Sequence, residues 1–214
     1  MHLARRLRLA LCDTALDVGP DASTLCGPWT VRDLLAHLVL RDRRPDGLPG
    51  VGVDWQPLKR HTERVQQSIA DQAFAALVQQ LRSGPPRWSP TAVVGVDKVV
   101  NTTEYMVHLQ DIVRAQPGWV PSPADARVEA AAWAALPRVA RLSFRSSPVG
   151  VVLVAPGHGR ALVRRPPAGT SSVVVTGPPL ELLMHAFGRT GVAQVSVDGE
   201  PSAVAALDAD ERSV

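Results

Sequence analysis

The sequence predicts an α+β protein, with a helical part over residues 1–145 and a small α+β unit over residues 146–214. Apolar residues recur at helical spacing through the first two thirds of the chain, and after Pro148 short β-branched runs alternate with Gly and Pro. The chain has 214 residues, of which 45% are hydrophobic and 20% charged, as in ordinary globular proteins. This length allows one large domain or two small ones with their own cores.

The first part of the sequence predicts six helices. Thr30 is the expected N-cap of the second helix, and Asp33 completes an approximate capping box. Pro45 ends that helix, and Pro137 is expected to kink the last one. The predicted helical stretches are residues 2–18, 30–44, 57–70, 72–83, 96–116 and 125–144.

The second part of the sequence predicts strands and two short helices. Runs such as VGVVLVA and SSVVVTG are rich in β-branched residues and are bounded by Gly or Pro, which is typical of strands. The segment PPLELLMHAFG has Pro at its start, where a helix tolerates the missing N–H, and is predicted to be a helix. Strands are expected near residues 149–154, 160–165, 172–176 and 193–197, with a closing helix over 201–207.

The composition argues against several classes of partner. The formal net charge is +3, and no basic run alternates with aromatic residues as in nucleic-acid-binding proteins. The apolar run between Arg8 and Asp13 is too short for a signal peptide, and no segment approaches the roughly 18 apolar residues of a membrane span. Cys12 and Cys26 lack the spacing of a metal motif and are interpreted as reduced thiols. We therefore expect a cytoplasmic protein that binds neither nucleic acid nor membrane.

A polar stripe runs along the predicted helix over residues 96–116. At about 100° per residue, its members fall within an arc of about 80° on an otherwise apolar helix. Such a stripe faces either solvent or a cavity where its groups need partners. The members are Asp97, Asn101, Glu104, His108 and Asp111.

His37 is the second candidate for a functional residue. It lies beside the apolar stripe of Leu34, Leu35 and Leu38, where a histidine is either a core-edge residue or a ligand. Two imidazoles and one carboxylate are a standard set of three protein ligands for a divalent metal with an open position. Glu104 and His108, four residues apart on one helix, can reach the same ion, and helix bundles build such sites between facing helices.

The sequence resembles the mycothiol-dependent maleylpyruvate isomerase group within the DinB-like superfamily of actinobacterial metal-binding proteins. The matching motifs are WTVRDLLAHL in the early helix, E-x-x-x-H-x-x-D-x-x-R at Glu104, His108, Asp111 and Arg114, and VTGPPLELLMHAFGR near the end. The segment LRDRRPDGLPGVGVDWQPLKRHTERV departs from the named isomerase and is more similar to a separate subgroup. The metal site is therefore better supported than any substrate.

The resemblance implies a DinB-like four-helix bundle followed by a small domain of sterol-carrier-like fold. It also implies that His37, Glu104 and His108 hold a divalent metal, usually zinc, and that mycothiol is the thiol cosubstrate. By the same resemblance, Arg189 reaches toward the active site and binds a substrate carboxylate. The alternative for Arg189 is a basic residue favoured by the dipole at a helix C-terminus.

A zinc ion held by these three ligands would leave its fourth position for a small thiol. A free thiol has a pKa of about 8.5, and coordination to zinc removes its proton. The resulting nucleophile can add to an activated double bond, allow rotation and depart, which is isomerisation, or it can remain attached, which is S-transfer. Asp111 either orients a ligand histidine or is an exposed carboxylate near Arg114.

Two other functions remain open at the level of sequence. A non-catalytic protein could hold a structural metal and carry an apolar ligand in its α+β unit. A zinc-dependent hydrolase would instead use water as its nucleophile, but no general base is evident beside the proposed ligands. The leading expectation is a thiol-dependent isomerase or S-transferase acting on a small carboxylate-bearing substrate.

Overall fold

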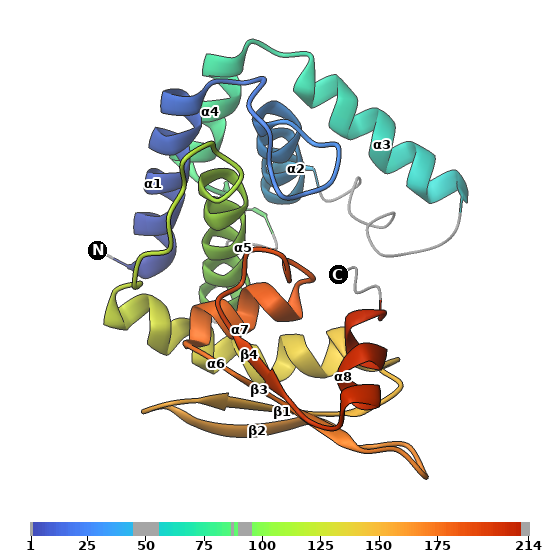
Figure 1. Cartoon of the computed structure of the whole chain (residues 1–214). Helices are drawn as coiled ribbons and strands as arrows, with labels where there is room; N and C mark the ends of the chain where they lie inside the picture. The colour runs from blue at the N-terminus through green and yellow to red at the C-terminus, as the bar shows by residue number, and fades with distance from the viewer. Residues whose placement is uncertain (1, 45–55, 87, 90–95, 211–214) are drawn as a thin grey trace. The chain divides into compact units, whose positions relative to one another are not determined.

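The structure is a computed structural model of the chain, and it describes residues 2–44, 56–86, 88–89 and 96–210. The described residues form eight helices and a four-stranded sheet, which confirms the α+β class (Figure 1). They divide into two compact units, Met1–Val120 and Pro121–Val214. No helix in the described ranges is both long enough and apolar enough to cross a bilayer.

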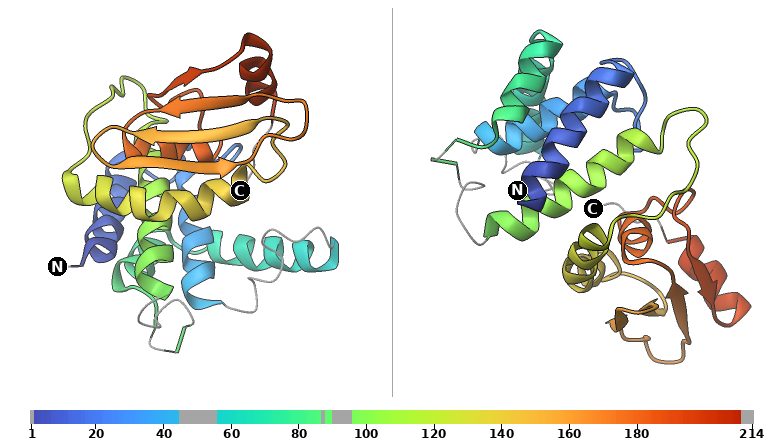
Figure 2. Two further views of the ribbon diagram at one scale, coloured as in Figure 1. Left: turned by 90° about the horizontal axis from the view of Figure 1, so that it is seen from below. Right: turned by 90° about the vertical axis from the view of Figure 1, so that its left-hand side faces the viewer.

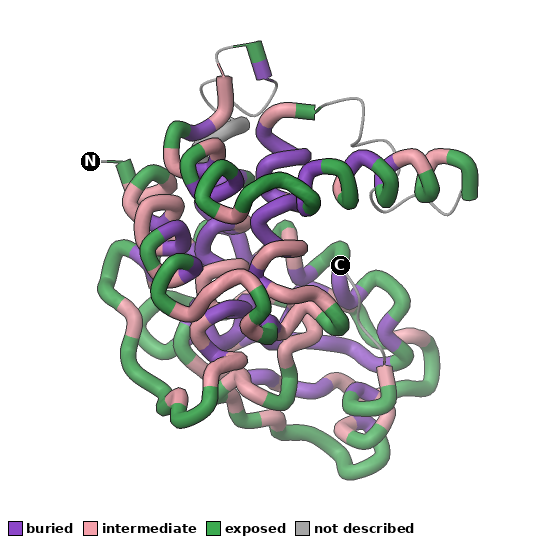
Figure 3. Tube along the Cα trace, turned by 90° about the horizontal axis from the view of Figure 1, so that it is seen from above, coloured by how far each residue is buried: buried purple, intermediate pink, exposed green. Residues whose placement is uncertain are grey.

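The first unit is helical. Its helices are α1 (Leu3–Val18), α2 (Val31–Arg43), α3 (Gln56–Ala70), α4 (Phe74–Ser83) and α5 (Val96–Val113). Helix α1 packs on α5 and α4, while α2 packs on α3 and α4. Most positions of α2 are buried, and Leu34, Leu35 and Leu38 form its core-facing stripe (Figure 3).

The predicted capping box at the start of α2 is confirmed. The Thr30 hydroxyl accepts a hydrogen bond from the backbone N–H of Asp33, and the Asp33 carboxylate accepts one from the backbone N–H of Thr30 at 2.9 Å. These bonds satisfy donors that a helix N-terminus otherwise leaves unpaired. Helix α2 ends at Arg43; the predicted stop signal, Pro45, lies outside the described residues, as does the side chain of Asp97.

The second unit combines three helices with the sheet. Its elements are α6 (Ala126–Ser143), β1 (Gly150–Ala155), β2 (Gly159–Arg164), β3 (Ser172–Thr176), α7 (Pro179–Ala186), β4 (Ser196–Asp198) and α8 (Pro201–Asp208). The strand order is β2-β1-β3-β4, with β1 and β3 parallel and the outer pairs antiparallel. The predicted strands near 149–154 and 172–176 correspond to β1 and β3. The strand predicted near 193–197 corresponds to β4, which is shorter and begins at Ser196.

Helices α6 and α7 pack against each other, and they contact β2 and β1 respectively (Figure 2, right). On β3, Val173 and Val175 are buried at alternate positions, as the two-residue period of a strand requires, whereas β1 is buried continuously from Gly150 to Leu153. Glu129 on α6 accepts a hydrogen bond at 2.9 Å from the backbone N–H of Leu180, which ties α6 to the first turn of α7.

The grouping of α6 differs from the sequence-based expectation. A boundary between residues 145 and 146 places this helix with the helical part, whereas the structure groups it with the sheet and α7. The apolar face of α6 includes Val128, Ala132, Ala135 and Leu136, and helical periodicity shows such a face without showing which partner covers it. The expected α+β unit therefore gains the last long helix as one of its layers.

Candidate metal centre

The three sequence-predicted ligands meet at one point of the first unit. His37 extends from α2, and Glu104 and His108 extend from successive turns of α5. One ligand atom from each side chain lies within 4.8 Å of the others. The His37 and His108 rings are in an edge-to-face arrangement with their centroids 5.7 Å apart.

This donor set fits a divalent cation of the zinc type. Tetrahedral zinc with bonds of about 2.1 Å separates its ligand atoms by about 3.4 Å. The distance between His108 Nε2 and Glu104 Oε2 is 3.5 Å, so this pair already has the required spacing. Two imidazole nitrogens and a carboxylate oxygen are also ligands that zinc accepts. The chain would supply three ligands and leave further positions to other molecules.

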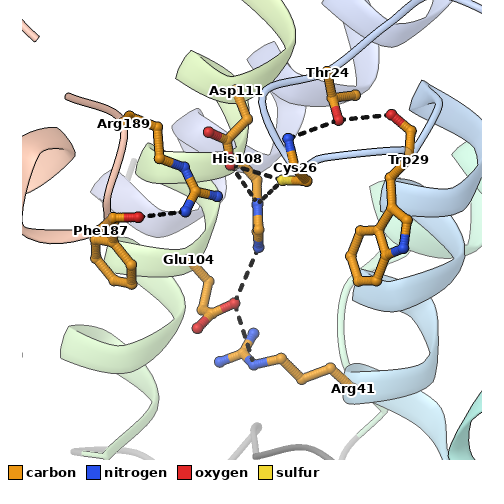
Figure 4. Close-up of polar contacts among 9 residues, drawn as sticks. All are labelled: Thr24, Cys26, Trp29, Arg41, Glu104, His108, Asp111, Phe187 and Arg189. Carbon is orange, nitrogen blue, oxygen red and sulfur yellow. Dashed lines mark hydrogen bonds and ion pairs between the residues drawn. The ribbon is translucent and has the colours of Figure 1, made fainter. Parts of the chain in front are cut away.

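The imidazole of His108 is held by Asp111 through Nδ1, the ring nitrogen that does not face Glu104. Its Nδ1 lies 3.0 Å from Asp111 Oδ2, and the Asp111 side chain is fully buried (Figure 4). A hydrogen bond from Nδ1–H to this carboxylate leaves Nε2 directed toward Glu104. The contact is the arrangement by which a carboxylate orients a metal-binding histidine.

Cys26 joins this pair from the loop that precedes α2. Its Sγ is 3.1 Å from Asp111 Oδ2 and 3.8 Å from His108 Nδ1 (Figure 4). Cys26, His108 and Asp111 thus form a second group with metal-ligating atoms close together, and it shares His108 with the first group. Cys26 belongs to no recognisable sequence motif, since nothing local signals that its loop returns to α5.

Arg41 is a second contributor that sequence reasoning missed. Its guanidinium is buried, with Nε 3.9 Å from Glu104 Oε2 and Nη2 donating a 2.5 Å hydrogen bond to Asn101 Oδ1. Its neighbour Asp42 accepts a 2.9 Å hydrogen bond from the Tyr105 hydroxyl. A positive charge beside Glu104 favours the ionised carboxylate that a metal needs.

These contacts distinguish between the two interpretations of the polar stripe on α5. Asn101 bonds Arg41, Glu104 lies beside Arg41 and His108, and Asp111 holds His108. A solvated helix face would not give each of its polar groups a protein partner. The described part of the stripe is therefore a connected polar network in the first unit.

The three ligands differ in their protonation. Burial, assisted by the charge of His108, lowers the pKa of His37 to about 4. For Glu104, burial raises the pKa, but the hydrogen bond from His108 and the charge of Arg41 together outweigh it and lower the value to about 2. Burial lowers the pKa of His108, yet its hydrogen bonds to Asp111, Cys26 and Glu104 together raise it well above the ordinary value. Without metal, the neutral-pH site thus contains an ionised Glu104, a neutral His37 and a protonated His108.

Arg189 belongs to the second unit. Helix α7 ends in a Schellman motif, in which Arg189 N–H bonds the Met184 carbonyl at 3.0 Å and Gly188 adopts a φ of 82°. The Arg189 side chain donates a 2.6 Å hydrogen bond from Nη1 to the Phe187 carbonyl (Figure 4). The helix-end environment expected for this residue is therefore present, and its role toward a substrate stays a prediction.

Comparison with known proteins gives a likeness of fold. No family model matches the sequence, and no curated protein matches it either. A crystal structure of a histidine-to-alanine mutant of the mycothiol-dependent maleylpyruvate isomerase is similar, with a TM-score of 0.63 and 15% identity. A second crystal structure of that isomerase has a TM-score of 0.56 and 16% identity, and each alignment covers 98% of this chain and 93% of the other. This likeness supports an α+β fold shared with that isomerase over nearly the whole chain. The DinB-like four-helix bundle and the sterol-carrier-like domain stay predictions.

Proposed function

We propose that this chain is a thiol-dependent metalloenzyme in which His37, Glu104 and His108 hold a divalent cation of the zinc type. The observation that carries the proposal is the approach of the three ligand atoms to within 4.8 Å of one another, at positions named from sequence. The fold of a mycothiol-dependent isomerase supports the same class of reaction. The thiol is of the mycothiol class, and the reaction is isomerisation or S-transfer on a small carboxylate-bearing substrate.

The cation, when bound, would lower the pKa of a coordinating thiol, so that a thiolate is available at neutral pH. Asp111 holds His108 by its Nδ1, and the hydrogen bond from His108 together with the charge of Arg41 keeps Glu104 ionised. In isomerisation, the thiolate sulfur bonds one carbon of a conjugated double bond while the π electrons move to the carbonyl. After rotation the carbon–sulfur bond breaks, the double bond re-forms, and the thiol is recovered unchanged. In S-transfer the carbon–sulfur bond persists, and a proton completes the product.

Arg189 completes the proposal as the group that binds a substrate carboxylate. A guanidinium pairs with carboxylates in a bidentate manner, and the family resemblance assigns this task to Arg189. Asp111 gives little support to a hydrolase, since this buried carboxylate accepts hydrogen bonds from both His108 and Cys26 at one oxygen. That engagement leaves it poorly suited to remove a proton from water.

Metal analysis followed by a thiol titration tests the proposal. The purified protein should contain about one equivalent of divalent metal, or take it up, through the three protein ligands expected of such a site. After cobalt substitution, mycothiol should produce the charge-transfer absorption of a cobalt–thiolate bond, and His108→Ala should abolish the signal. A cobalt spectrum that mycothiol leaves unchanged would refute a thiol-activating role. Thiol consumption measured with an activated cis-alkene then separates transfer from isomerisation.

A further inference from the structure

The loop between α1 and α2 contacts both histidines of the candidate metal centre, although they belong to different helices. Trp29 packs on His37, with ring centroids 5.2 Å apart. Cys26 bonds the carboxylate that holds His108 (Figure 4). From these contacts we infer that Cys26 is a positioning residue, which fixes His108 through Asp111. The inference rests on the proposed function, because it gives Cys26 a task in metal binding.

The Asp111 carboxylate oxygen is the point where the two contacts converge. Oδ2 lies 3.0 Å from His108 Nδ1 and 3.1 Å from Cys26 Sγ, so it accepts from both groups. A thiol is a weak donor, but an ionised and fully buried acceptor strengthens the bond. Removing the thiol leaves this oxygen with one fewer donor and with space into which the side chain can rotate.

The backbone places the Cys26 thiol at this oxygen. Leu25 N–H donates a 3.0 Å hydrogen bond to the Asp111 carbonyl, which joins the loop directly to α5. Cys26 N–H donates to Thr24 Oγ1 at 3.1 Å, and that hydroxyl donates to the Trp29 carbonyl at 2.8 Å. The loop is thus closed on itself and attached to the helix whose histidine it holds.

A second cation at Cys26, His108 and Asp111 is the competing explanation. These atoms also form a group that could hold a metal, but their spacing is that of hydrogen bonds, 3.0 and 3.1 Å, between donors and one acceptor. An ion at this place would have to break both hydrogen bonds to the fully buried Asp111 carboxylate, the one from His108 Nδ1 and the one from Cys26 Sγ. The hydrogen-bonded arrangement accounts for the contacts without that cost, so we argue for positioning.

Three variants of the full-length chain separate these explanations. Cys26→Ala removes the donor, Cys26→Ser restores a donor at nearly the same place, and Cys12→Ala removes the other thiol, whose Sγ faces the Val78 carbonyl on α4. Replacing partners of ligand residues costs about 10–100-fold in metal affinity, and Cys26 acts one bond further out, so Cys26→Ala should weaken cobalt binding by about 3–10-fold. Cys26→Ser should recover affinity to within about twofold of wild type, and Cys12→Ala should change it by less than that.

A measurement on the metal-free protein is independent of the proposed function. Nitrogen-15 NMR of the imidazole rings should show a protected Nδ1 proton on His108 in wild type and Cys26→Ser, and faster exchange of that proton in Cys26→Ala. If wild type binds no metal, the proposed function is refuted, and this NMR comparison alone decides whether Cys26 positions His108.

Two results would overturn the inference. In the first, Cys26→Ala lowers the thermal midpoint but leaves both the Nδ1 proton and the cobalt affinity unchanged, which is a purely structural role. In the second, wild type binds a second equivalent of cobalt that Cys26→Ala and Cys26→Ser both lose, which is a second cation site.

Discussion

His108 Nδ1 and Asp111 Oδ2 lie 3.0 Å apart, one turn of α5 from each other. The bond turns the opposite ring nitrogen, Nε2, toward Glu104 on the preceding turn, where the two atoms are 3.5 Å apart. One helix therefore supplies two of the proposed metal ligands and the carboxylate that aligns one of them. A segment of eight successive positions, 104 to 111 in the sequence, contains three of the residues of the proposed site.

Replacing His108 with Ala should abolish stoichiometric metal binding. Two remaining ligands, His37 and Glu104, do not hold zinc as three do. The helical circular dichroism should remain close to wild type, because the core of α5 is formed by residues such as Met106 and Ile112. Calorimetric titration with zinc measures the loss, and His158→Ala, at an exposed position of the second unit, is the control. Retention of full affinity in His108→Ala would exclude His108 as a ligand.

Metal binding at pH 7 should release about one proton. His37, with a pKa of about 4, and Glu104, with a pKa of about 2, have already lost theirs at this pH. The pKa of His108 is raised well above its usual range by Asp111, Cys26 and Glu104 against the effect of burial, so it must give up its Nε2 proton. Affinity should therefore rise with pH, by about tenfold per unit while His108 remains protonated in the free protein.

Calorimetry in two buffers of different ionisation enthalpy measures this release. The apparent binding enthalpy should differ between the buffers by about one buffer ionisation enthalpy. An enthalpy that does not depend on the buffer would show that His108 is neutral before metal arrives. His108→Ala is unsuitable as a control because it removes the site, so Asp111→Asn serves, with a smaller proton release expected.

Asp111→Asn should weaken metal binding by about 10–100-fold without removing it. The amide keeps an oxygen that can accept from His108 Nδ1, but it lacks the charge that strengthens the bond and fixes the ring. A competitive titration against a chelator of known affinity gives the ratio of the two constants. An unchanged affinity would mean that packing alone orients His108.

Cys12 should resist alkylation in the folded protein. Its side chain is fully buried, and burial raises the pKa of the thiol to about 11, so almost no thiolate is present at pH 8. Iodoacetamide followed by peptide mass spectrometry should modify Cys12 only after denaturant unfolds the first unit. Rapid modification under native conditions would contradict the packing of α1 against α4. Cys26→Ser isolates this reaction from that of the other thiol.

The local features of the fold were predictable from the sequence because short-range chemistry determines them. Thr30 and Asp33 form a capping box through bonds three residues apart, and the strands near 149–154 and 172–176 follow from β-branched runs. The spacing of Glu104 and His108 places them on one face of any helix. His37 required more than periodicity, since the resemblance singled it out from a helix that is apolar on most sides.

The features that depend on tertiary placement were not predictable. Cys26 reaches Asp111, 85 positions later, because backbone bonds attach its loop to α5, and no local pattern signals that return. Arg41 belongs to the charged sequence RDRR, which is typical of a solvated helix end, yet its guanidinium is buried beside Asn101 and Glu104. Helix α6 has a helical pattern whose partners, α7 and strand β2, only the fold reveals.

Arg189→Ala should reduce turnover far more than metal affinity. A charged hydrogen bond to a carboxylate contributes about 1.5–3 kcal/mol, so kcat/KM for a small carboxylate-bearing substrate should fall by about 10–100-fold. Metal affinity should stay within about twofold of wild type, because the three proposed ligands all belong to the first unit. Arg189→Lys keeps the charge but loses the bidentate geometry, so an intermediate rate is expected. Arg160→Ala, at an exposed position on β2, controls for the loss of a surface charge. Equal rates for Arg189→Ala and wild type would exclude a role for this side chain in binding the substrate.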